Sequence, residues 1–157
     1  MATQEPSIKT RLQADLTASM RARDELTTST LRMLRAAITN AEVAGAEAIE
    51  LSDDQTIAVF QSEAKKRAEA AEIYEQAGRA ETAAKERAEL VVIERYLPAA
   101  MDDAELQAIV TEEVANAAAS GAEGQRAMGQ VIKAVRERVG AGADGGRIAA
   151  MVKSALA

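Results

Sequence analysis

The chain has 157 residues and a net charge of −6, and 37 of its residues are alanine. Alanine is the strongest helix former and only 2% of the residues are aromatic, so the composition predicts an all-α fold of slim, closely spaced helices. Cysteine and histidine are absent, which excludes disulfides, thiolate nucleophiles, the usual zinc sites and histidine-based acid–base catalysis.

Capping residues and apolar spacing predict two helices before residue 50. Ser7 opens the first, in which apolar side chains recur at every fourth position from Ile8 to Met20. Asp24 opens the second, which is expected to end at Gly45. The spacing of the second helix also gives it one apolar face for a core.

The next two predicted helices form a long antiparallel hairpin. The third starts at Ser52 and ends before Gly78, because glycine tolerates the left-handed conformation that often follows a helix. The fourth runs from about 80 to 96. Its expected apolar residues are Ala84, Ala88 and Val91, with Leu90 and Ile93 as further candidates.

The segment "YLPAAMDDAEL" marks a domain boundary. Pro98 disfavours helix at the preceding residue, and Asp102 followed three residues later by Glu105 has the spacing of a capping box. The expected parts are a four-helix N-terminal domain (1–98) and a small three-helix C-terminal domain (99–157). The three later helices are expected at about 103–119, about 125–139 and from the Asp144 cap to Leu156.

Charge is unevenly distributed along the chain. Residues 124–157 contain six Lys and Arg against Glu137 and Asp144, a balance of +4, whereas the preceding 123 residues carry −10. Such asymmetry suggests an anionic partner for the basic tail. The alternative is a helix face that is merely solvated.

The helix expected at 125–139 separates into two faces. Its apolar side consists of Met128, Val131, Ile132, Val135 and Val139, and its opposite side of Arg126, Gln130, Lys133, Arg136 and Glu137. Gly129 lies at the edge of the apolar stripe, although glycine within a helix costs about 1 kcal/mol relative to alanine. Close approach of a second helix, the commoner reason, or of a phosphate would explain it.

The segment "ADGG" precedes the last helix. A helix N-terminus with exposed glycine amides can bind phosphate, but the Asp144 carboxylate already caps those amides and repels anions. We therefore interpret the segment as a tight turn. Arg136, Arg138 and Arg147 around it suit a phosphate backbone, while the lack of aromatic residues in the tail argues against base stacking.

No catalytic residue, metal site or cofactor is predicted. Glu86, Glu89 and Glu94 lack the histidine partner of carboxylate metal sites, so a solvated face with ion pairs is expected. Tyr96 is expected to pack at the domain junction. The start of the sequence has no signal-peptide pattern and no apolar run approaches the ~20 residues of a membrane span, so we expect a soluble, cytoplasmic protein without membrane contact.

Several motifs resemble, in order, those of the GatB/YqeY family. They are "LRMLRAAITNAE" (31–42), "AGR" (77–79), "KERAEL" (85–90), "YLP" (96–98), "MGQVIKAV" (128–135) and "ADGG" (143–146). The resemblance implies a two-part helical fold. In this family the homologous module forms the tail of the B subunit of tRNA-dependent amidotransferases and is fused to some glutaminyl-tRNA synthetases, where it serves tRNA binding.

The resemblance therefore implies a non-catalytic module that binds the tRNA backbone through its basic tail. The candidate RNA-binding residues are Arg126, Gly129, Lys133, Arg136, Arg138, Arg147 and Lys153. One alternative is a protein-interaction adaptor that docks on an amidotransferase or aminoacyl-tRNA synthetase. Another, inherited from the family alone, is participation in carbon–nitrogen ligase activity with glutamine as amido donor. No residues here match the amidotransferase's catalytic machinery, so the chain is not expected to act as an enzyme on its own.

Overall fold

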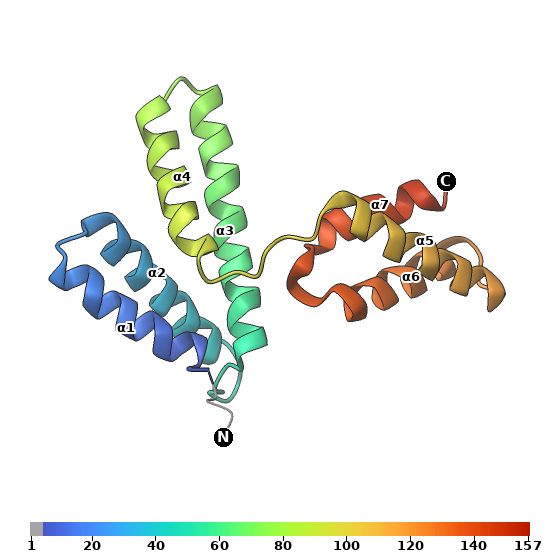
Figure 1. The fold of residues 1–157 in the computed structure, drawn as a ribbon, viewed down its shortest axis with the longest axis horizontal. Helices are drawn as coiled ribbons and strands as arrows, with labels where there is room; N and C mark the ends of the chain where they lie inside the picture. Colours follow the sequence, from blue (N-terminus) through green and yellow to red (C-terminus); the bar gives the residue numbers. More distant parts are fainter. Residues whose placement is uncertain (1–4) are drawn as a thin grey trace. The chain divides into compact units, whose positions relative to one another are not determined.

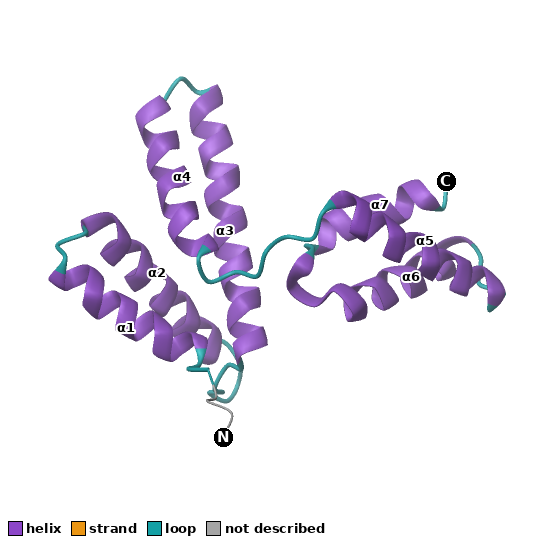
Figure 2. Cartoon of the chain, viewed as in Figure 1, coloured by secondary structure: helices purple, strands orange, loops and turns teal. Residues whose placement is uncertain are grey.

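The computed structural model describes residues 5–157, in which there are seven α-helices, one 3-10 turn and no strand (Figures 1 and 2). The helices are α1 (Ile8–Arg21), α2 (Glu25–Glu42), α3 (Asp53–Gln76), α4 (Ala80–Glu94), α5 (Asp103–Ala119), α6 (Gly124–Val139) and α7 (Gly145–Ala155). The all-α prediction is confirmed. Two compact units share the chain: the first ends at Leu97 and holds α1–α4, and the second, Pro98–Ala157, holds α5–α7.

The predicted capping residues begin five of the helices. The side chains of Ser7, Asp24, Ser52, Asp102 and Asp144 each accept a hydrogen bond from the backbone amide three residues later. At α5 the bond is reciprocated, because the amide of Asp102 also donates to Glu105, which completes the expected capping box. Gly78, after α3, has φ +73°, the left-handed conformation predicted for it.

In the first unit, α1 and α2 form one antiparallel pair and α3 and α4 form the other (Figure 1). Phe60 is fully buried in the core, and its ring meets that of Tyr96 edge to face at 5.6 Å. The hydroxyl of Tyr96 donates to Asp15 on α1. Burial, and then the bond to Asp15, raise the pKa of Tyr96, so the phenol stays protonated and its hydroxyl links the end of α4 to α1.

Some predicted core positions and ends in this unit are wrong. Met20 is 43% exposed and Val91 is 55% exposed, and Ala84 is exposed as well. The buried residues of α4 are Ala83, Val92 and Ile93. Because α4 contacts both α2 and α3, the side facing the core is not the one that the alanine spacing indicated. The end of α2 also comes earlier, at Glu42 rather than Gly45.

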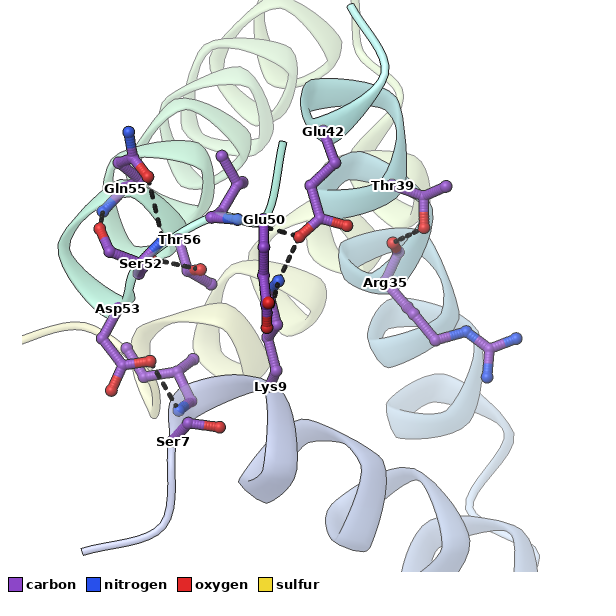
Figure 3. A network of polar contacts seen from close by, with 12 residues as sticks. Ser7, Lys9, Arg35, Thr39, Glu42, Glu50, Ser52, Asp53, Gln55 and Thr56 are labelled. Atoms are coloured by element: carbon purple, nitrogen blue, oxygen red, sulfur yellow. Dashed lines mark hydrogen bonds and ion pairs between the residues drawn. The ribbon is translucent and has the colours of Figure 1, made fainter. Parts of the chain in front are cut away.

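A polar network holds the start of α1, the end of α2 and the start of α3 together (Figure 3). The carboxylate of Glu42 accepts from the Lys9 ammonium and from the amide of Leu51, at 3.1 Å for the latter. The Lys9 hydrogen bond, and then that of Leu51, lower the pKa of Glu42. The amide of Ile8 donates to Asp53 at 3.1 Å. These bonds fix both ends of the exposed segment 43–50.

The turn between α1 and α2 contains a strained residue. The amides of Arg23 and Asp24 donate to the carbonyls of Met20 (3.2 Å) and Ser19 (3.0 Å), the pattern of a Schellman motif. Arg23 occupies the position that glycine normally takes, with φ +58°, and it is the only non-glycine residue with positive φ in the described part of the chain. The left-handed conformation costs a residue with a Cβ atom roughly 1–2 kcal/mol.

In the second unit, three helices surround a small aliphatic core. Its most buried members are Leu106, Val110, Val131, Val135, Ile148 and Val152. The amide of Met101 donates to the carbonyl of Gly142 at 2.8 Å, which ties the segment before α5 to the 3-10 turn (Gly140–Gly142) that follows α6. All three aromatic residues of the chain precede residue 98, so the core of this unit contains none.

Candidate nucleic-acid interface

The outer face of α6 carries a row of basic residues. Arg126, Gly129, Lys133 and Arg136 follow one another at spacings of three, four and three residues, which places them along one side of the helix. All four are exposed. The buried residues of α6, on the other side, are Ala127, Val131, Val135 and Val139. The predicted division of this helix into a polar and an apolar face is confirmed.

Gly129 lies in open space between Arg126 and Lys133. Apart from its two chain neighbours and the backbone of its own helix, a Cβ atom added to it would meet no described atom within 4 Å. The expectation that a second helix packs on this glycine is therefore wrong, because the position faces outward. The other reason weighed for a glycine here, close approach of a phosphate, stays a prediction.

Arg136 extends from this row toward α7. A Cβ atom at Gly145 would overlap the guanidinium of Arg136, whose Cζ would lie 3.3 Å away. The glycine in the "ADGG" segment thus makes room for the Arg136 side chain. Asp144 accepts from the amide of Arg147 at 2.9 Å, so its carboxylate caps α7 as predicted.

Two of the candidate arginines are already paired with carboxylates of α5. Arg138 Nη1 lies 2.8 Å from Glu113 and 2.9 Å from Glu112, and Arg147 Nη2 lies 2.6 Å from Asp103. The hydrogen bond from Arg138 lowers the pKa of Glu113. The positive charge of these two arginines is largely compensated within the chain.

The other four candidate cations make no ion pair within 4.0 Å in the described residues: Arg126, Lys133, Arg136 and Lys153. The first three share the outer face of α6. Lys153, on α7, lines a separate groove of about 420 Å³ together with residues at the start of α6 such as Gln125 and Met128. The structure thus brings four of the seven predicted residues, Gly129 among them, into one row on α6.

Elsewhere, two of the three acidic residues weighed as a metal site pair with a cation. Glu86 and Glu89 on α4 lie 3.6 and 3.0 Å from Arg67 Nε on α3. Within residues 5–157 no three acidic side chains are grouped so that they could hold a metal ion. The helices in this range are also too short or too polar to cross a bilayer.

A comparison with known protein families identifies the family of this chain. The sequence model described as Yqey-like protein matches residues 9–156, nearly the whole chain. The chain belongs to the YqeY family. A search of curated proteins finds no match. The resemblance seen in the ordered motifs is therefore confirmed at the level of this YqeY family.

The sequence did not reveal which cations of the YqeY-family chain would be neutralised. Asp103, Glu112 and Glu113 lie on a helix that is distant in sequence from Arg138 and Arg147, and their pairing depends on the rotation of α5 against α6 and α7. A single sequence contains no signal for that rotation beyond the apolar face of each helix.

Proposed function

We propose that this chain is a non-catalytic tRNA-binding accessory module that contacts the sugar–phosphate backbone through the outer face of α6. The observation that carries the proposal is the row of Arg126, Lys133 and Arg136, which are exposed, make no ion pair with any residue from 5 to 157, and have Gly129 between them. The four-helix and three-helix parts are proposed to be separate domains, of which the second supplies this surface. The resemblance to the tail of the amidotransferase B subunit supports the proposal.

Backbone contact explains why cations are sufficient for this surface. Phosphates are bound through positive charge, and such contacts position a protein on the nucleic acid without specifying bases. A glycine between cations lets a phosphate come closer to the helix than any larger residue would. Arg138 and Arg147 are proposed to contribute less than Arg136, because carboxylates of α5 already compensate them.

A second candidate function is that of an adaptor docking on an amidotransferase or aminoacyl-tRNA synthetase. Ile73 on α3 and Val91 on α4 favour it, because these large apolar side chains are 64% and 55% exposed on the α3–α4 hairpin. Participation in carbon–nitrogen ligation with glutamine as amido donor would then be assistance to the docked enzyme.

Reversing two charges on α6 tests the proposal. The variant Lys133→Glu/Arg136→Glu is expected to bind total tRNA roughly 100-fold more weakly, about tenfold for each reversed cation. Wild-type binding itself should weaken steeply with salt. The measurement is a titration at two salt concentrations, and Lys65→Glu/Lys85→Glu provides a control with the same charge change at exposed sites in the first unit.

An equal loss in both double variants would attribute the effect to overall charge. Unchanged affinity in the α6 variant would reject tRNA binding by this face. A salt-tolerant complex with a synthetase or amidotransferase that persists in the α6 variant would instead favour the adaptor.

Gly129→Ala separates stability from binding. The space above Gly129 is open, so alanine is expected to stabilise α6 by about 1 kcal/mol through its higher helix propensity. The added methyl group should nevertheless lower tRNA affinity, because it keeps the phosphate from the backbone. Thermal unfolding followed by circular dichroism and the same titration give the two values. A stabilised variant with wild-type affinity would show that the glycine has no part in binding.

A further inference from the structure

A second basic groove lies at the other end of the chain, where α1 turns into α2. Its lining residues are Met20, Arg23, Glu25, Thr28, Ser29 and Arg32, and its volume is about 370 Å³. Arg23 comes from the turn and Arg32 from the second helical turn of α2, and both residues line the same groove.

The guanidinium groups of this groove are not used by the fold. Arg23 and Arg32 are exposed and make no ion pair within 4.0 Å in the described residues. The side-chain hydrogen bond of Arg32 goes to the Met20 sulfur, a weak acceptor, at 3.5 Å. The nearest cap carboxylate, Asp24, is bound to the amide and hydroxyl of Thr27. Glu25 is the one acidic residue in the lining.

Arg23 also occupies a backbone conformation that disfavours it. Its φ of +58° suits glycine, yet the chain places a long cationic side chain there. Strained residues of this kind cluster at functional sites, where the side chain is needed in spite of its cost. The strain and the groove are independent observations on the same residue.

We propose that this groove binds a backbone phosphate of the same RNA, as a second contact in the first unit. The inference rests on the proposed tRNA binding and extends it to residues outside the basic tail. Guanidinium groups bind phosphate through paired hydrogen bonds, and two of them at one groove suit a single phosphate. A protein partner would be expected to find aromatic or large apolar anchors, and Met20 is the one apolar side chain in the lining.

The first test is Arg23→Glu/Arg32→Glu in the full chain, titrated with total tRNA over a series of salt concentrations. We expect affinity to fall about tenfold or more and the slope of log affinity against log salt to decrease by about two, because each arginine that no longer neutralises phosphate lowers it by about one. Lys65→Glu/Lys85→Glu, with the same charge change in the same unit, should have a much smaller effect on both quantities.

The second test uses the strain itself. Arg23→Gly should raise the melting temperature of the tyrosine-containing first unit by about 4 °C, because glycine suits the left-handed position. The same variant should bind tRNA more weakly than wild type, while Arg23→Lys, which keeps the charge, should retain most of the affinity. A higher melting temperature together with weaker tRNA binding cannot be explained by damage to the fold.

The outcomes separate this proposal from the proposed function. If the α6 variant loses binding and the groove variant behaves like Lys65→Glu/Lys85→Glu, the proposal that the groove binds RNA is rejected and the α6 interface is supported. An acidic protein surface would then be the alternative partner for the groove. If the groove variant alone loses binding, RNA binding by the groove is supported and RNA binding by α6 is rejected. If the wild-type chain binds no tRNA even at low salt, both are overturned.

Discussion

Replacing Phe60 with alanine is expected to lower the free energy of unfolding of the first unit by about 3–5 kcal/mol, the usual cost of truncating a buried aromatic residue. Phe60 is 0% exposed and belongs to the cluster that joins α1, α2, α3 and α4. The substitution removes its edge-to-face contact with Tyr96 and leaves a cavity among leucine and isoleucine side chains. A loss of this size is a large fraction of the stability of a typical domain.

The distribution of aromatic residues makes the effect measurable in the full chain. Tyr74 and Tyr96 both precede residue 98, so tyrosine fluorescence and near-ultraviolet circular dichroism report the first unit alone. Far-ultraviolet circular dichroism reports the helices of both units. In Phe60→Ala the tyrosine transition should move to lower denaturant, while the part of the helical signal from α5–α7 should unfold as in wild type.

Ile73→Ala is the matched control. Ile73 is 64% exposed on the same helix, so its truncation should change stability by less than about 0.5 kcal/mol. If Phe60→Ala shifts both transitions together, the two units unfold as one and the proposed division into separate domains is wrong.

The helix starts could be predicted because their causes are local. A serine or aspartate before an apolar-periodic segment satisfies orphan amides wherever the segment later packs, as Ser7, Ser52 and Asp102 do. The conformation of Gly78 is local in the same sense. None of these features depends on contacts with a distant element.

The side of α4 that faces the core could not be predicted, because its sequence is compatible with several orientations of the helix. In "AELVVI" four apolar residues follow one another, so a helix facing one neighbour and a helix facing two have almost the same pattern. Contacts with both α2 and α3 select Val92 and Ile93 for burial and leave Val91 exposed. The selection comes from tertiary structure.

In the candidate site, too, some features could be predicted from the sequence and others depend on tertiary structure. Periodicity was enough to place Arg126, Lys133 and Arg136 on the outer face of α6, because the aliphatic stripe opposite them is unambiguous. It could not show that Arg138 and Arg147 turn toward α5, nor that Gly129 faces open space. The groove at Arg23 and Arg32 was missed entirely, since the sequence signal was an arginine where a turn favours glycine, and the positive φ became visible only in the structure.

Replacing Val135 with aspartate is expected to unfold the second unit. Val135 is 0% exposed in a core without aromatic residues, and an unpaired carboxylate buried there costs several kcal/mol. A unit of about 60 residues rarely has more than about 3–5 kcal/mol of stability to lose. The far-ultraviolet signal of α5–α7 should disappear at ambient temperature, while the tyrosine signal of the first unit should be retained.

This variant distinguishes tRNA binding by a folded surface from tRNA binding by the positive charge of the tail alone. It keeps all six Lys and Arg residues of the tail and changes the net charge by one. If tRNA is bound by the arrangement of cations along α6, affinity should fall about as far as in Lys133→Glu/Arg136→Glu. Thr111→Asp, which adds the same charge at an exposed position of α5, should bind nearly as wild type. Near-wild-type affinity in the unfolded tail would mean that flexible positive charge is sufficient for RNA binding. The row on α6, with the glycine between its cations, would then be rejected as an RNA-binding surface.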